Sequence, residues 1–258
     1  MSKEVVLVTG GTGLVGKAIE AIVKAECPQL SFVFLSTKDG DLRDFTATKR
    51  IFEQYRPSMV IHCAAMVGGI FRNIDNHLNF FRTNMQINDN LHLGQPHEST
   101  FGYSYAKRMI DVWNQAYSRQ QTATNTKTIF TSVVPTNVYG PFDNFNIHDS
   151  HVIPGLINKA YLAVKEAKEK EVAKLIVFGS GEPQRQFIYS FDLARLIVWV
   201  LLNYNEVDPI ILSVDEEDEI SIEKAATLVA DAFSRRYNVQ FEIVKDTSMA
   251  EGQFKKTA

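Results

Sequence analysis

The chain has 258 residues, of which 45% are apolar and 22% charged, and its formal net charge at pH 7 is −3. A chain of this length buries on the order of 70–75% of its unfolded surface, so no disulfide or metal staple is needed. The acidic balance argues against nucleic-acid or membrane-surface binding, because no basic excess is available to meet phosphates.

The two cysteines and the apolar runs bear on location. Cys27 and Cys63 are far apart and show no metal-ligand spacing, so we expect reduced thiols and no metal site. The N-terminal segment lacks the long apolar core of a signal peptide, and no apolar run approaches membrane-spanning length. We therefore expect a cytoplasmic protein.

The first 65 residues alternate between strand and helix patterns. Continuous apolar runs at 4–10, 31–36 and 59–65 predict strands buried on both faces. Helical periodicity separates them at 14–26 and 44–55. Successive strand–helix repeats predict a parallel sheet with right-handed crossovers, a doubly wound α/β fold of Rossmann type.

The alternation then breaks. Residues 72–93 and 102–118 read as two helices with no apolar strand between them. The sequence therefore predicts that one central strand of the expected sheet is missing. If it is absent, the edges on either side are exposed, unless the strand at 128–135 moves across to pair with the strand at 59–65.

The second half continues in mixed patterns. A helix is expected at 221–237, capped by Ser221. The other expected elements are a strand entering a loop at 128–141, a charged helix at 161–174, strands at 175–179, 209–214 and 239–246, a strand–turn–helix at 187–204, and a terminal loop at 247–258.

A glycine-rich turn joins the first strand to the first helix. Gly10, Gly13 and Gly16 allow a tight turn, close approach of a pyrophosphate, and helix–strand packing. The helix N-terminus, with Leu14 and Val15, then offers amides and a dipole to phosphates. A structural turn is the alternative, but the strand–turn–helix setting favours a dinucleotide site.

The end of the second strand bears on which dinucleotide binds. An NAD-preferring site places Asp or Glu there, whereas this chain has Ser36, Thr37 and Lys38. Hydroxyls and a cation suit a 2′-phosphate, so we expect NADP(H), with a solvated loop lysine as the alternative for Lys38. Asp41 and Leu42 follow where adenine contacts are plausible.

Tyr103 and Lys107 are four residues apart, a spacing that places both on one helical face. The lysine can bind the cofactor ribose and lower the phenol pKa from about 10, so that the tyrosine protonates a carbonyl as hydride arrives. A surface pair is the alternative reading, but the upstream glycine motif favours a reductase.

Several stretches together resemble one family. The chain is similar to the extended short-chain dehydrogenase/reductases, and among them to the GDP-L-fucose synthase family of GDP-4-keto-6-deoxymannose epimerase-reductases. The stretches that carry the resemblance are VTGGTGLVGKAI, HCAAMVGGIFRN, FGYSYAKRMIDV, PTNVYGPFDNFN, DSHVIPGLI, GSGEPQRQFIYSFDLA and GQFKKTA.

The resemblance implies NADP-dependent epimerisation and reduction of GDP-4-keto-6-deoxymannose by a homodimer. It implies Tyr103 and Lys107 as the reduction pair and His151 as an epimerisation acid, a role that suits a group titrating near neutrality. The implied cofactor contacts include Ala64, Ala65, Pro135, Asn137, Val138 and His151. The implied substrate contacts are Lys159, Phe178, Arg185 and Lys256.

The same resemblance sharpens the gap between the two helices. The family carries a Ser-[Ser/Thr]-Cys strand there, with the serine orienting the ketone and the cysteine acting as a base. Here Ser99 and Thr100 precede the second helix, where capping is their simplest role. We expect an NADP-binding domain at 1–145 and a mainly substrate-binding region at 146–258, shortened at its C-terminus, with some elements returning to the first sheet.

Three alternatives remain open at the level of sequence. The chain is an epimerase-reductase with residual NADPH chemistry, a non-catalytic NADP-binding form, or a chain that does not fold stably. A reductase or epimerase for another nucleotide sugar is the chemical alternative.

Overall fold

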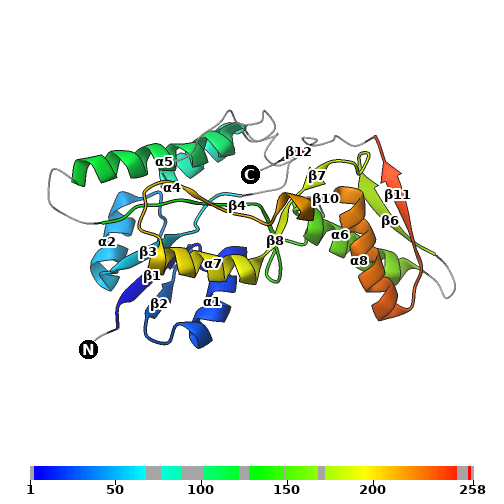
Figure 1. Cartoon of the computed structure of the whole chain (residues 1–258), viewed down its shortest axis with the longest axis horizontal. Coiled ribbons are helices and arrows are strands. Elements are labelled where there is room, and N and C mark those ends of the chain that lie inside the picture. Colours follow the sequence, from blue (N-terminus) through cyan, green and yellow to red (C-terminus); the bar gives the residue numbers. More distant parts are fainter. Residues whose placement is uncertain are drawn as a thin grey trace.

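The computed structural model describes residues 3–67, 77–88, 101–121, 128–147, 149–167, 172–248 and 255–256 (Figure 1). Its first part follows the predicted strand–helix alternation closely. The elements are β1 (Val5–Thr9), α1 (Leu14–Glu26), β2 (Ser31–Phe34), α2 (Phe45–Tyr55) and β3 (Met59–His62).

These three strands form one parallel sheet with β1 in the centre. Val6 lies opposite Phe32 on β2 and opposite Met59 on β3. Asp44 caps α2 by accepting the amide hydrogen of Thr46, and Arg56 ends that helix in the left-handed conformation. The Rossmann-type start expected from the sequence is confirmed.

The strand pairing among the described residues bears on the gap predicted in the sheet. Helices α4 (His77–Asn88) and α5 (Phe101–Gln121) pack against each other, and β4 (Val133–Pro135) follows. Within the described residues, β3 pairs with β1 alone, whereas β4 pairs in parallel with β9 (Ile210–Leu212). Residues 128–132 lie outside any strand, so the segment does not move across to β3.

The remaining strands form short ladders. β5 (Asn137–Tyr139) pairs in parallel with β8 (Phe187–Tyr189), and β6 (Ala173–Phe178) with β11 (Phe241–Asp246). β7 (Gln184–Arg185) lies between β10 (Ile220–Ser221) and β12 (Lys255–Lys256). The last strand, β12, lies in the segment that was expected to be a loop. The sequence did not predict it because a strand of two residues is too short to show a periodic pattern.

The helices of this part are α6 (Val152–Glu166), α7 (Ser190–Asn203) and α8 (Ile222–Tyr237), with a short 3₁₀ turn at Glu216–Asp218. Ser221 caps α8 as predicted, accepting the Lys224 amide hydrogen at 3.0 Å. The predicted helix at 161–174 is misplaced. The helix begins earlier and includes Pro154 and Gly155, two residue types that usually indicate a loop. Proline is tolerated there because the amide groups of the first helical turn have no partner within the helix, so its missing N–H costs nothing.

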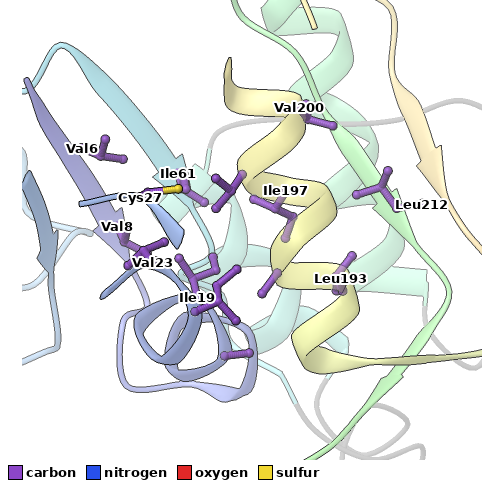
Figure 2. Close-up of a cluster of buried hydrophobic side chains, with 14 of the residues drawn as sticks. Val6, Val8, Ile19, Val23, Cys27, Ile61, Leu193, Ile197, Val200 and Leu212 are labelled. Atoms are coloured by element: carbon purple, nitrogen blue, oxygen red, sulfur yellow. The ribbon is translucent and has the colours of Figure 1, made fainter. Parts of the chain in front are cut away.

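Two main hydrophobic clusters hold these elements, and Figure 2 shows the first of them. The first buries one side of β1 and β3 against α1 and α7, and it includes Leu212 of β9. The second joins α6, β6 and α8 around Leu175 and Ala226. The first cluster therefore connects the β2–β1–β3 sheet with the β4–β9 ladder through side chains. No helix among the described residues is long and apolar enough to span a membrane.

Helix α7 offers a matched test of this cluster. Leu193 is fully buried, whereas Leu196 on the same helix is 37% exposed. We expect Leu193→Ala to lower the free energy of unfolding by about 2–5 kcal/mol, because it leaves a cavity in the core. Leu196→Ala should cost clearly less in urea denaturation, and equal losses would contradict the assignment of α7 to the core.

Candidate functional site

Two glycines of the turn after β1, Gly10 and Gly16, leave no room for a side chain. Gly10 is in the left-handed region with φ 66°, and a Cβ there would lie 2.8 Å from the Ala64 nitrogen. A Cβ at Gly16 would meet the Gly10 carbonyl oxygen and lie 2.6 Å from the Cα of Gly11. The helix and strand therefore approach each other as closely as a dinucleotide turn requires.

Helix α1 begins directly from this turn. Gly13 is its N-cap, no side chain caps it, and no acidic residue lies in the first turn. Leu14 and Val15 open the helix, so its first amides are not shielded by a capping side chain. This is an arrangement that suits a phosphate at the helix N-terminus.

The segment after β2 differs in one respect from the sequence reading. Asp39 accepts hydrogen bonds from the Ser36 amide and hydroxyl, at 2.7 and 2.9 Å. These bonds lower the pKa of Asp39. An acidic group therefore lies beside Ser36, although none stands directly at the strand end, and Lys38 is exposed next to it. The signal that could have found it is the Ser-x-x-Asp spacing of a side-chain-bonded turn.

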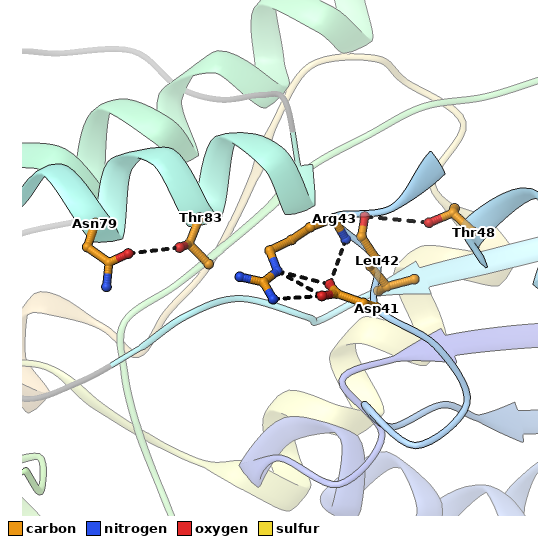
Figure 3. A network of polar contacts seen from close by, with 6 residues as sticks. All are labelled: Asp41, Leu42, Arg43, Thr48, Asn79 and Thr83. Carbon is orange, nitrogen blue, oxygen red and sulfur yellow. Dashed lines mark hydrogen bonds and ion pairs between the residues drawn. The ribbon is translucent and has the colours of Figure 1, made fainter. Parts of the chain in front are cut away.

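Asp41 is paired rather than free. The Arg43 side chain donates hydrogen bonds to both Asp41 carboxylate oxygens, which lowers the pKa of Asp41 to about 2 (Figure 3). Leu42 lies between them in the sequence and packs with the small cluster formed by Leu7, Leu35 and Ile51.

The end of β3 is tied to the end of β1. Thr9, which is 3% exposed, has its hydroxyl 2.6 Å from Nδ1 of His62 and accepts the Ala64 amide hydrogen at 3.2 Å. Ala64 and Ala65 follow as half-buried residues beside Gly10. Thr9 and His62 were not singled out in the sequence, because their partnership depends on the pairing of two distant strands.

Asn137 lies on β5, next to β8. Its amide nitrogen Nδ2 donates to the Gln186 carbonyl at 2.8 Å, and its backbone N–H donates to the same oxygen. Pro135 ends β4 and Val138 is in the centre of β5. The Asn137 side chain therefore has a structural contact in addition to any role toward a cofactor.

The predicted reduction pair lies on one helix. Tyr103 and Lys107 both belong to α5, which gives them the helical backbone that their spacing requires. Their side chains lie outside the described part of the chain, as do Ser99 and Thr100.

His151 is the N-cap of α6. Its side chain is 51% exposed, and its Nδ1 lies 3.6 Å from Oδ1 of Asp143, whose side chain is 4% exposed. The sequence indicated His151 but not Asp143, which is eight residues earlier.

Two of the predicted substrate residues touch each other. The Lys159 ammonium lies 3.2 Å from the centroid of the Phe178 ring and donates to the Ile176 carbonyl at 3.1 Å. Burial lowers the pKa of Lys159 to about 8, although the nearby Asp246 carboxylate opposes that shift. An ammonium over an aromatic ring is a favourable contact.

The other two substrate residues are neighbours across a ladder. Arg185 of β7 is paired in register with Lys256 of β12. Burial also lowers the pKa of the Arg185 guanidinium, with Glu219 opposing the shift. The backbone register therefore brings two cationic residues, far apart in the chain, to one place in the sheet.

The fold and the glycine turn define a nucleotide-dependent enzyme of the Rossmann class. The model of the NAD dependent epimerase/dehydratase family matches residues 6–92 and 91–214, and the chain belongs to this family. The two matched pieces meet at residues 91–92, in the stretch where the sequence predicts a missing strand.

Particular relatives narrow the class. The chain is 45% identical to the GDP-L-fucose synthase of Dictyostelium discoideum over 292 positions, covering 100% of this chain and 87% of the relative. It is also 45% identical to the probable GDP-L-fucose synthase of Drosophila melanogaster, covering 98% and 88%. Because 292 aligned positions exceed 258 residues, the first alignment opens gaps in this chain.

A solved structure agrees with this assignment. The GDP-L-fucose synthetase of Naegleria fowleri bound to NADP superposes with a TM-score of 0.87 at 41% identity, covering 100% of this chain and 86% of that one. The short-chain dehydrogenase/reductase fold expected from the sequence is therefore confirmed.

The glycine turn provides a first test of the site. We expect Gly16→Ala to destabilise the fold by roughly 1–3 kcal/mol or more, because its methyl group meets backbone atoms that cannot rotate away. Gly13→Ala should cost less, since its nearest contact is the Gly10 oxygen at 3.3 Å. Thermal unfolding measures both variants, and an equal loss would contradict the close approach at Gly16.

Lys159 provides a second test. Because its pKa is lowered in the folded chain, the unfolded chain binds more protons between about pH 8 and the ordinary lysine pKa. The stability of the unmodified protein relative to Lys159→Met should therefore rise with pH across this window and be flat below it. Urea unfolding at pH 7 and at several points above pH 8 measures the difference, and a flat profile would contradict the shift.

Proposed function

We propose that this chain is an NADP-dependent epimerase-reductase that converts GDP-4-keto-6-deoxymannose to GDP-L-fucose. The observation that carries the proposal is the glycine turn between β1 and α1, where Gly16 packs directly on Gly10 in a family member. The NADP-bound Naegleria fowleri structure, at 41% identity, supports the choice of cofactor.

Most of the proposed cofactor contacts lie just after the carboxyl ends of β1, β2 and β3. The first amides of α1 hold the pyrophosphate, and Ser36 with Lys38 holds the 2′-phosphate. Asp41 and Leu42 lie toward the adenine, and Ala64 with Ala65 toward the adjoining ribose. Pro135, Asn137 and Val138 lie toward the nicotinamide. Bound NADPH supplies the hydride.

The proposed chemistry belongs to three side chains. Lys107 binds the nicotinamide ribose and lowers the pKa of Tyr103 electrostatically. Tyr103 donates its phenolic proton to the ketone oxygen, which becomes the C4 hydroxyl. His151 protonates a sugar carbon during epimerisation, and its imidazole is half-exposed, so a substrate can reach it.

The proposed substrate contacts lie in the second part of the chain. Arg185 and Lys256, paired across β7 and β12, provide positive charge for the GDP diphosphate. The other proposed substrate contact is Lys159 of α6 together with the Phe178 ring at the end of β6, which its ammonium touches. We also propose the division into a cofactor domain at 1–145 and a substrate region at 146–258, a homodimeric state, and a cytoplasmic location.

A second candidate function is a non-catalytic NADP-binding form. Two observations favour it. The family match is broken at residues 91–92, and β3 and β4 are not paired with each other in the described part of the chain. The resemblance places a ketone-orienting serine and a basic cysteine in the segment between them. Loss of that segment affects epimerisation most directly.

The experiment compares this chain with a chimera. The corresponding segment of the Dictyostelium discoideum relative is inserted between residues 91 and 92, and NADPH consumption with GDP-4-keto-6-deoxymannose is followed for both proteins. We expect both to bind NADPH and the chimera to turn over at least ~10²-fold faster, in line with the loss of one positioned acid–base group.

The outcomes separate the two functions. If the chimera consumes NADPH and the unmodified chain does not, the fold supports the family's reaction but this chain is the non-catalytic NADP-binding form. Equal turnover by both would show that other groups supply the hydroxyl and the base. The proposal would be overturned if neither protein bound NADPH. Other GDP- and UDP-keto sugars serve as the control for substrate choice.

A further inference from the structure

We propose that Asp143 is a positioning residue for His151, holding the imidazole with Nδ1 toward the Asp143 carboxylate and Nε2 toward solvent and substrate. This inference rests on the proposed role of His151 as an acid. It begins with the ion pair itself, because a half-exposed ring meets a carboxylate whose side chain is only 4% exposed.

The loop that carries Asp143 turns this side chain inward. Phe142 has φ 73°, in the left-handed region that side chains other than glycine rarely occupy. The Phe142 ring is itself 57% exposed, so burial of that ring does not explain the conformation. The residue that the turn buries is the next one, Asp143. Unfavourable backbone conformations of this kind concentrate at functional sites.

The buried carboxylate has unused acceptor capacity. Its Oδ1 accepts the Asn144 amide hydrogen at 2.8 Å, and its Oδ2 is buried with no hydrogen-bond partner among the described residues. A buried carboxylate is costly without donors. The Nδ1 nitrogen of His151 lies 3.6 Å from Oδ1, within ion-pair reach, and can donate to the carboxylate when it carries hydrogen.

The separation of 3.6 Å is longer than a hydrogen bond. Catalytic hydrogen bonds are often long before substrate binds and shorten in the complex. A small rotation of the exposed imidazole closes this contact without moving the backbone. Asp143 therefore acts through the histidine and not on the substrate.

Both partners stand on fixed backbone. The His151 carbonyl accepts the Gly155 amide hydrogen at 3.0 Å, which holds the residue as the N-cap of α6. Asn158 of the same helix donates to the Phe145 carbonyl at 2.6 Å, which ties the Asp143 loop to α6. The relative positions of the carboxylate and the imidazole are thus set by one helix.

The chemical consequence concerns which ring nitrogen carries the proton. With Nδ1–H donating to Asp143, the neutral ring keeps Nε2 unprotonated, and the acid form delivers its proton from Nε2. Without the carboxylate, the ring is free to exchange tautomers and to rotate. The carboxylate therefore sets the direction in which His151 transfers a proton.

The test reads the tautomer directly in the full 258-residue chain, labelled with ¹⁵N-histidine. The protein has six histidines, and His151→Asn identifies the signal that belongs to residue 151. Spectra are recorded at several pH values up to about 8.5, and the tautomer is read from the signals of the neutral ring. We expect the Nδ1–H tautomer to dominate in the unmodified protein and to be lost in Asp143→Asn.

Asp149→Asn is the matched control. It removes one carboxylate from the same loop, two residues from His151, and no ion pair joins Asp149 to the ring within the described residues. It should leave the tautomer unchanged. An Nε2–H tautomer in the unmodified protein overturns the inference even if Asp143→Asn fails to fold, and so does an unchanged tautomer in a folded Asp143→Asn.

This readout needs no turnover, so it is separable from the proposed function. If the chain is inactive but its His151 tautomer depends on Asp143, the positioning contact is supported. Only the proposed reaction is then contradicted. In an active chimera, the same contact predicts that Asp143→Asn lowers kcat while leaving KM for the GDP-sugar nearly unchanged, because Asp143 does not touch the substrate.

Discussion

The packing of α7 on α1 is the contact on which the rest of this structure depends. The β2–β1–β3 sheet and the β4–β9 ladder share no backbone hydrogen bond among the described residues, yet both contribute side chains to the cluster around these helices. Burial of apolar side chains can join two sheets that share no hydrogen bonds, because its free energy depends on the apolar area removed from water and not on the alignment of the strands. The β2–β1–β3 sheet and the β4–β9 ladder, whose strand β4 leads to Asn137, are thereby held together.

The sequence predicted most of the first half because local and global signals agree there. Helix α1 matches its prediction at both ends, since a glycine turn starts it and apolar periodicity continues through it. The later elements were harder to place. The start of α6 contains Pro154 and Gly155, and β12 is only two residues long, so both depend on tertiary contacts that no local pattern encodes.

The candidate site shows the same division. The residues of the glycine turn were singled out by motif, and Lys159 and Phe178 by resemblance to the family. Asp39, Thr9 and Asp143 were missed, because each is defined by a partner that folding brings near. Motifs identify groups with evident chemistry, whereas the residues that orient those groups are ordinary loop carboxylates and hydroxyls until the backbone places them. Such orienting residues are found only from the distances between side chains in the folded structure.

The outer side of β3 has a consequence for the behaviour of the protein in solution. Val60 on this strand is 40% exposed, and in the described part of the chain no second strand covers the side away from β1. A strand side without a ladder partner is, in general, a template for an extended segment of another molecule. On this ground we expect the association of this chain with other molecules to depend on its concentration.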